Sequence, residues 1–254
     1  MSTIYSTAFR CVDCGAAVDV RVADSLNANR LPEARRWVLD RTLFQHPCAC
    51  GRTVTAIHPF LYVDFDRGLW VQVLPEDQRP AYHAHEPEVV AAYRAVFDPV
   101  TGPRFIASLG SLVTPRLVYG YEELREKVVG GDAALDDALV EALKLEILAT
   151  QPDLLRRGVM LLTLDGADAL ALRFLSYGFP PGGPGEILGD IAVPRAMYDA
   201  LAERKAAVRD SYPSLFEGVY VNVQRYRFEP AEAQSASSLT SPEASRVPAD
   251  AARS

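Results

Sequence analysis

All four cysteines lie in two short runs, Cys11-Val12-Asp13-Cys14-Gly15 and His46-Pro47-Cys48-Ala49-Cys50-Gly51. A structural zinc ion takes four nitrogen or sulfur ligands in a tetrahedron, usually as two close pairs from two loops. The first run has the C-x-x-C spacing of a zinc knuckle, and the second has a tighter C-x-C pair. The pattern predicts one zinc site in the N-terminal region, with the ligands Cys11, Cys14, Cys48 and Cys50.

His46 stands close enough to the second pair to replace one thiolate, but we favour an ordinary loop histidine at this position. The segment between the pairs, residues 15–47, is longer than the spacing of a compact zinc ribbon. A helix predicted around Trp37 accounts for the excess. Because the metal would close a long loop, its removal should loosen the whole N-terminal part.

The composition is that of a soluble globular protein. Of the 254 residues, 49% are hydrophobic and 23% are charged. The net charge of -7 disfavours non-specific binding to nucleic acids or anionic membranes. No apolar run is long enough to span a bilayer, and the first ten residues lack the apolar region of a signal peptide. We therefore expect a cytoplasmic protein, whose reduced thiols bind metal rather than form structural disulfides.

Apolar periodicity and turn residues predict an α+β fold. A β-hairpin is expected from residues 53–65 and 69–74, with the turn at Asp66-Arg67-Gly68. Further strands are expected at 17–24, 116–119, 159–164, 169–176, 186–188 and 218–228. Helices are expected at 31–40, 87–97, 122–129, 132–150 and 193–208.

The helix at 132–150 has the strongest pattern. Asp132 is its expected N-cap, after a glycine pair that closes the preceding helix. Its leucine stripe is typical of a buried core face, formed by Leu135, Leu139, Leu143 and Ile147.

The chain is predicted to have three parts. Residues 1–152 form a zinc-ribbon-like β-hairpin domain with flanking helices, and residues 153–229 form a smaller α+β region. Residues 179–185 are a loop because proline and glycine dominate them. Residues 230–254 are rich in Ala, Ser, Glu and Pro with almost no large apolar residue, which predicts a disordered tail.

Two redox interpretations compete with a structural zinc site. A thioredoxin-like C-x-x-C lies at a helix N-terminus, which lowers the thiol pKa. Here a strand-like run follows Cys14, which disfavours that interpretation. One C-x-x-C and one C-x-C around zinc also resemble the site of the redox-switched bacterial chaperone, with the pair order reversed. A zinc-thiolate switch therefore stays an alternative.

Few residues outside the cysteine runs indicate catalysis. His83-Ala84-His85 could hold a metal on a strand, but we expect it to lie in a loop between Pro80 and Pro87. The acidic pairs Glu122-Glu123 and Asp136-Asp137 are typical of solvated helix faces. The sequence contains no G-x-S-x-G, no P-loop and no G-x-G-x-x-G after a strand. We therefore predict no catalytic residues.

Five arginines near the cysteines raise the alternative of a nucleic-acid-binding zinc ribbon. We favour the simpler explanation, a solvated helix face with scattered strand arginines. These residues are Arg21, Arg30, Arg35, Arg36 and Arg41.

The run Phe9-Arg10-Cys11-x-x-Cys14-Gly15, followed by Ser25-Leu26-Asn27-Ala28 and by Leu43-Phe44 before the second pair, resembles the bacterial CpXC family. That family is named for two Cys-Pro-x-Cys motifs, and the similarity covers about residues 8–150, including the predicted hairpin.

The chain departs from the family motif in both cysteine runs. Val12 replaces the first proline. Pro47 occupies the place of an opening cysteine, so we expect Cys48, one position later, to have taken over its role. The resemblance implies zinc binding in a domain without an assigned activity.

Together these features predict a non-catalytic, zinc-stabilised scaffold or protein-interaction module of the bacterial cytoplasm. A protein partner is expected, and membrane association is not. The nucleic-acid-binding ribbon and the redox-sensing switch are the alternatives.

Overall fold

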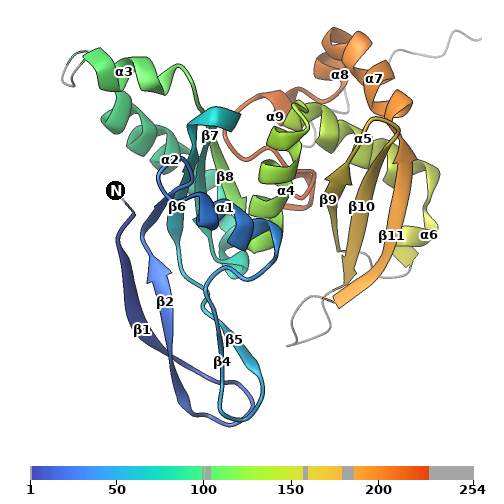
Figure 1. The fold of residues 1–254 in the computed structure, drawn as a ribbon. Coiled ribbons are helices and arrows are strands. Elements are labelled where there is room, and N and C mark those ends of the chain that lie inside the picture. Colours follow the sequence, from blue (N-terminus) through green and yellow to red (C-terminus); the bar gives the residue numbers. More distant parts are fainter. Residues whose placement is uncertain (1, 99, 101–103, 157–159, 179–185, 229–254) are drawn as a thin grey trace, which may run out of the picture.

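A computed structural model describes residues 2–98, 100, 104–156, 160–178 and 186–228. Within these ranges the chain is a mixed α+β protein, as the sequence predicts (Figure 1). The expected loop at 179–185 and the expected tail at 230–254 lie outside the described residues. No helix in the described ranges is long and apolar enough to cross a membrane.

A four-stranded sheet forms the centre of the N-terminal half. Its strands lie in the order β3 (Ser25–Asn27), β6 (Phe60–Asp64), β7 (Leu69–Leu74) and β8 (Thr114–Tyr119). The predicted antiparallel pairing is confirmed in β6 and β7, but its first strand begins at Phe60 and not at residue 53. Strands β3 and β8 add in parallel. The turn passes through the 3-10 helix η1 (Phe65–Arg67) to Gly68, whose φ of 67° is left-handed and favours glycine.

Two small hairpins extend side by side from this sheet (Figure 1). One pairs β1 (Ile4–Arg10) with β2 (Ala17–Ala23), and the other pairs β4 (Gln45–Pro47) with β5 (Thr53–Thr55). The alternation predicted for β2 is confirmed from Ala17 to Val22, since Val18, Val20 and Val22 are buried while Ala17, Asp19 and Arg21 are exposed. The turns of both hairpins lie at the same end and contain the cysteines.

Helices α1 (Pro32–Leu39) and α4 (Gly120–Asp132) complete the N-terminal core. The prediction for α1 is confirmed, and its first residue, Pro32, has the fixed φ that suits a helix start. Helix α4 is longer than predicted, because it continues through Gly130-Gly131 to Asp132. Asp132 is therefore not an N-cap; its carboxylate instead bonds the guanidinium groups of Arg35 and Arg67.

Helix α2 (Tyr82–Phe97) follows the 3-10 helix η2 (Glu76–Ala81) and packs beside α3 (Arg104–Gly110). The prediction that His83 and His85 lie in a loop is wrong. Pro87 does not start the helix but lies inside it, where it removes one backbone donor without ending the helix.

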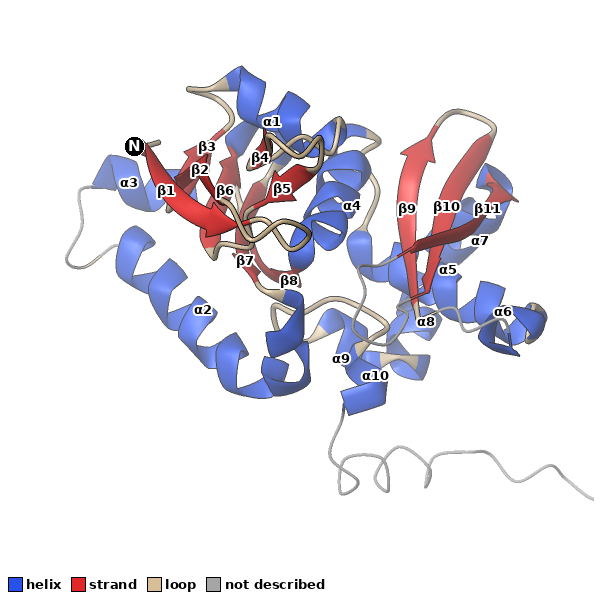
Figure 2. Ribbon diagram, turned by 90° about the horizontal axis from the view of Figure 1, so that it is seen from below, coloured by secondary structure: helices blue, strands red, loops and turns tan. Residues whose placement is uncertain are grey.

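The C-terminal half pairs an antiparallel sheet with helices (Figure 2). Its strands lie in the order β11 (Glu186–Pro194), β10 (Ala171–Gly178) and β9 (Leu161–Ala167). The helices are α5 (Asp137–Thr150), α6 (Asp153–Arg156), α7 (Arg195–Glu203), α8 (Lys205–Ser211), α9 (Pro213–Phe216) and α10 (Arg225–Phe228).

Helix α5 supplies the apolar centre of this half. Leu139, Leu143 and Ile147 are buried, which confirms the predicted core stripe, while Leu135 lies in the turn before the helix. The N-cap is Asp136, whose carboxylate accepts from the amides of Ala138 and Leu139. Because α5 shares its core with β9 and β10, it packs with strands that follow the predicted boundary at residue 152. The division into domains stays a prediction.

The strand predicted at 218–228 does not form. Three of its amides bond to carboxylates of helices α2 and α5 rather than to a neighbouring strand. Glu86 accepts from Val219 and Tyr220, and Glu141 accepts from Val223. The apolar residues of 218–224 therefore fill the space between the two halves without regular structure, and residues 225–228 form helix α10.

Candidate metal centre

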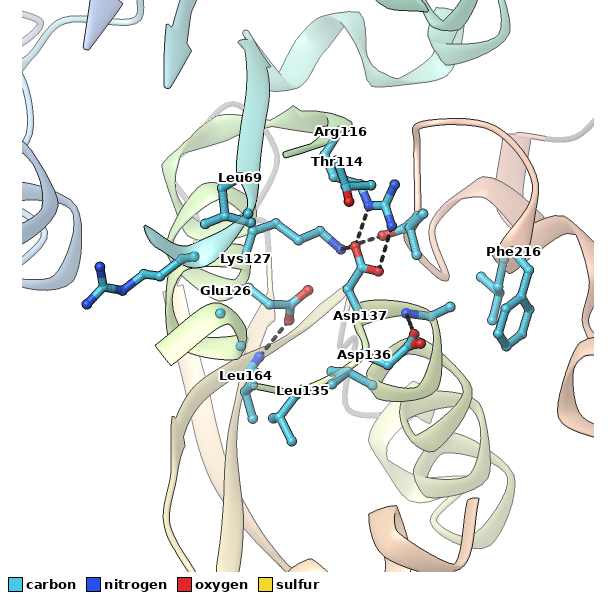
Figure 3. A pocket seen from close by; sticks show the side chains of 18 of the residues that line it. Leu69, Thr114, Arg116, Glu126, Lys127, Leu135, Asp136, Asp137, Leu164 and Phe216 are labelled. Atoms are coloured by element: carbon cyan, nitrogen blue, oxygen red, sulfur yellow. Dashed lines mark hydrogen bonds and ion pairs between the residues drawn. The ribbon is translucent and has the colours of Figure 1, made fainter. Parts of the chain in front are cut away.

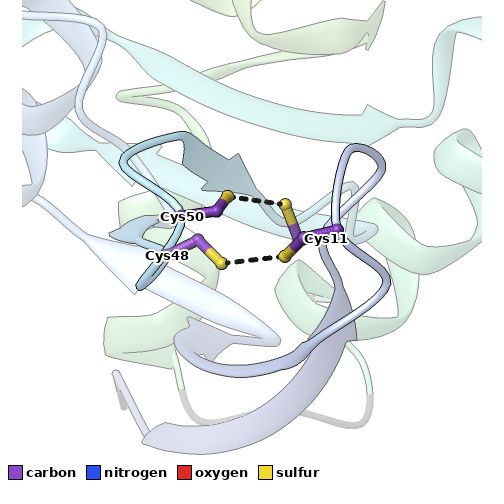
Figure 4. A group of neighbouring side chains, drawn as sticks. Cys11, Cys48 and Cys50 are labelled. Atoms are coloured by element: carbon purple, nitrogen blue, oxygen red, sulfur yellow. Dashed lines mark hydrogen bonds between the residues drawn. The ribbon is translucent and has the colours of Figure 1, made fainter.

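The sulfur atoms of Cys11, Cys14, Cys48 and Cys50 all lie within 4.8 Å of one another. The Sγ atoms of Cys11 and Cys50 are 3.7 Å apart, and those of Cys14 and Cys48 are 3.6 Å apart (Figure 4). A tetrahedron with zinc–sulfur bonds of about 2.3 Å has sulfur–sulfur edges of about 3.8 Å. The four predicted ligands thus come together from two loops. Two of the six sulfur–sulfur distances match the edge of such a tetrahedron, and none exceeds 4.8 Å.

The two loops have related backbone geometry. The amide of Gly15 donates to the carbonyl of Cys11 at 2.9 Å, and the amide of Gly51 donates to that of Cys48 at 2.9 Å. Both glycines have positive φ, 72° and 88°, which costs another residue about 1–2 kcal/mol. Each glycine therefore allows a tight turn directly after a cysteine: Gly15 follows Cys14, and Gly51 follows Cys50.

The site has an inner and an outer pair of sulfurs. Cys11 and Cys48 are buried in the N-terminal core, whereas Cys14 and Cys50 are exposed. Beside them, Arg52 and Asp13 form an ion pair of 2.6 Å that joins the two turns at the surface. A metal here would connect the core to two exposed loops.

The thiols have unequal affinities for protons. The amides of Cys14 and Asp13 lower the pKa of Cys11 to about 7. The amide of Arg52 favours the thiolate of Cys50, but the adjacent sulfurs of Cys48 and Cys14 outweigh it and raise the pKa of Cys50 to about 12. Four thiolates at such distances repel one another, so a cation is needed to hold them all deprotonated. Thiolate ligands favour zinc, copper(I) or iron.

Other histidines do not join the site. His46 lies in β4 opposite Val54 with its side chain exposed, and it is not among the clustered ligand atoms of the described residues. His83 and His85 are two residues apart on a helix and so point in different directions. Nδ1 of His85 lies 2.8 Å from the hydroxyl of Tyr119, which gives it a structural partner.

The structure also contains a buried charge network that the sequence prediction missed. Nζ of Lys144 lies 2.6 Å from Glu126 and 2.7 Å from Glu141, and all three side chains are buried. Beside them Asp137 accepts from Arg116 at 2.6 Å and from Lys127 at 3.2 Å. The prediction of a solvated face at Asp136-Asp137 is therefore wrong.

The same correction applies to Glu122-Glu123. Glu123 is fully buried and bonds Arg79 and the amide of Tyr119. Glu122 bonds Arg41, which also contacts Asp165 of β9 at 2.8 Å. These carboxylates hold elements together instead of facing solvent.

Stability should fall as the pH rises from about 5 to 8 because of Glu141. Burial raises the pKa of this carboxyl to about 8, and the Glu126 carboxylate adds to the effect while Lys144 opposes it. Between the ordinary pKa and 8, the folded state binds more protons at Glu141 than the unfolded state does, so the unfolding free energy decreases with pH. Urea unfolding of the wild type and Glu141→Gln across this range should show a steeper decrease in the wild type. Parallel pH profiles would contradict the assignment.

Comparison with known proteins identifies the N-terminal part of the chain. Residues 9–144 match the family model described as CpXC protein. No curated protein and no solved structure shows detectable similarity to the chain. Because the match spans more than half of the sequence and includes all four clustered cysteines, the chain belongs to the CpXC protein family.

Proposed function

We propose that this chain is a non-catalytic zinc protein, in which one Cys₄-bound ion fastens the β1–β2 hairpin to the β4–β5 hairpin as in a zinc ribbon. The four-thiolate cluster is the observation that carries the proposal. Structural zinc sites are closed by four protein ligands, whereas catalytic sites keep a position for water. Four cysteine sulfurs within reach of one ion would fill all four positions and leave none for water.

Metal content by mass spectrometry tests the proposed ligand set. Protein purified under reducing conditions should contain one zinc per chain. Cys48→Ser should lose it, because Cys48 supplies one of four thiolates. His46→Ala is the matched control and should retain the zinc, since its exposed side chain is not in the cluster. A parent protein without zinc, or a Cys48→Ser variant that keeps full occupancy, would overturn the proposal.

We further propose that the metal-bound loops bind a protein partner in the bacterial cytoplasm. Val12 lies between the first two cysteines and is 98% exposed, so it is accessible to a partner that approaches the metal-bound loops. A photoreactive amino acid at position 12 should cross-link to one defined protein in bacterial cells. The same amino acid at exposed Glu203, on α7, should not. An absence of products at position 12 would contradict the interaction.

A redox-sensing switch is the second candidate, and the distances between sulfurs of different loops favour a specific product. Two thiolates would give one disulfide and pass two electrons to a peroxide, with release of the metal. The bonds expected are Cys11–Cys50 and Cys14–Cys48. Peptide mapping after peroxide treatment should find these bonds together with zinc release. Retention of zinc at peroxide levels that oxidise known sensors would exclude the switch.

The nucleic-acid alternative has less support from the arginines. Arg35 is paired with Asp132, and Arg41 is paired with Glu122 and Asp165. These guanidinium groups already form ion pairs within the protein, so fewer of the arginines are free to bind nucleic-acid phosphates. Steeply salt-dependent binding to DNA or RNA would nevertheless restore this alternative.

A further inference from the structure

A cavity of about 340 Å³ lies where the two halves of the chain meet, remote in sequence from the cysteine runs (Figure 3). Its wall is built by β7, β8, α4, the start of α5 and the α8–α9 segment. The volume is within the range of small-molecule sites. Three features of the wall indicate what the cavity binds.

The first feature is Gly130 in helix α4. Glycine within a helix is destabilising relative to alanine. The neighbouring Gly131 has a packing reason, because a Cβ there would lie 3.3 Å from Cβ of Arg67. Gly130 is also buried, yet a Cβ at this position would meet nothing within 4 Å. Since Gly130 lines the cavity, its missing side chain keeps space open inside the protein.

The second feature is a buried acceptor without a donor. Oε2 of Glu126 accepts from the amide of Leu164 and lies 2.6 Å from Nζ of Lys144. Oε1 is buried and has no hydrogen-bond partner among the described residues. Figure 3 shows this oxygen on the side of Asp137. Burial alone would raise the pKa of Glu126, but Lys144 and Lys127 hold it below its ordinary value, so the group is an ionised acceptor.

The third feature is the charge at the rim. Most cations of the wall have carboxylate partners within the protein: Arg116 and Lys127 share Asp137, and Lys205 pairs with Asp136. Arg209 differs, since its guanidinium lies 5.1 Å from the ring centre of Phe216 and forms no ion pair within the described ranges. The cavity therefore combines a surplus positive charge at its rim with an unpaired acceptor in its wall.

We propose that this cavity binds a small organic acid that also carries an amino or hydroxyl donor, of the size of an amino acid or hydroxy acid. The donor satisfies Oε1 of Glu126, and the carboxylate of the ligand pairs with Arg209. The space beside Gly130 accommodates the remainder of the molecule.

Ligand-observed NMR on the full chain tests the site with amino acids and lactate as probes. Acetate provides a control that lacks the donor, and ethanolamine provides one that lacks the anion. At least one donor-bearing acid should bind at millimolar concentration, and removal of either group should weaken binding about tenfold or more. If no probe binds the wild-type protein, or if acetate and lactate bind equally, the proposal is overturned.

Two variants and a control locate the binding. Gly130→Leu fills the open space and should abolish binding without lowering Tm, because leucine is the better helix former. Arg209→Met, at an exposed position, should weaken binding while the fold stays intact. Arg204→Met is the matched control, since Arg204 pairs with Glu146 and does not line the cavity. Unchanged binding in Arg209→Met, or in a folded Gly130→Leu, would place the ligand elsewhere and refute the assignment.

Discussion

Lys144→Met should lower the free energy of unfolding by about 3–5 kcal/mol. The ammonium of Lys144 is fully buried and lies between two buried carboxylates, 2.6 Å from Glu126 and 2.7 Å from Glu141. Methionine has a similar length and keeps the packing, but it leaves both acids without this cation. Breaking a buried pair on one side is far more destabilising than replacing the whole pair by apolar groups.

Urea unfolding monitored by circular dichroism provides the measurement. Arg204→Met removes an exposed ion pair with Glu146 and should change stability by less than about 1 kcal/mol. A Lys144→Met protein as stable as this control would show that the buried network does not hold the C-terminal core. Lys144→Met combined with Glu126→Gln and Glu141→Gln should recover stability, because no buried charge is then left without its partner.

Removal of the metal should open the two hairpins and leave the C-terminal core folded. The binding free energy of a structural zinc ion is about 10–16 kcal/mol in zinc-finger peptides, and much of it is used to order the loops that contain the ligands. Cys11 and Cys48 are part of the N-terminal core, so their release should also loosen the packing around them. The core of α5, β9 and β10 contains no ligand and should be unaffected.

Hydrogen exchange before and after chelation distinguishes these regions. The amides of Gly15 and Gly51, which bond within the cysteine loops, should exchange much faster in the metal-free protein. The amide of Leu164, held by Glu126, serves as the internal control. Equal protection of the loops with and without chelator would mean that the fold does not depend on the metal.

The cysteine cluster could be predicted because its signal is local. Each pair has its own spacing and its own glycine, and only the meeting of the two loops requires the fold. The amphipathic face of α5 and the β6–β7 hairpin are likewise short-range patterns, and both are confirmed.

The buried charges could not be predicted because their partners are distant in sequence. Lys127 donates to the carbonyl of Val221, and Glu141 accepts from the amide of Val223. A charged residue is normally exposed unless it is paired, and single-sequence patterns do not reveal pairing over such separations. The bond from Val223 to Glu141 also helps to keep residues 218–224 out of the predicted strand.

The predicted boundaries of helices α2 and α4 are wrong for a related reason. The intrinsic preferences of Pro87 and Gly130-Gly131 predict that helices begin or end at these residues. Tertiary contacts outweigh those preferences, since Gly131 packs against Arg67 and Asp132 bonds two arginines. No neighbouring atom excludes a side chain at Gly130, so packing does not explain the glycine there. The cavity that Gly130 lines provides the explanation.

The most direct test of the metal centre is zinc K-edge X-ray absorption of the purified, reduced protein. We predict four sulfur neighbours at about 2.3 Å and no nitrogen or oxygen in the first coordination shell. This result would establish a closed site formed by Cys11, Cys14, Cys48 and Cys50. Three sulfurs with one lighter neighbour would contradict it, because an open or histidine-substituted site would then replace the closed four-thiolate centre.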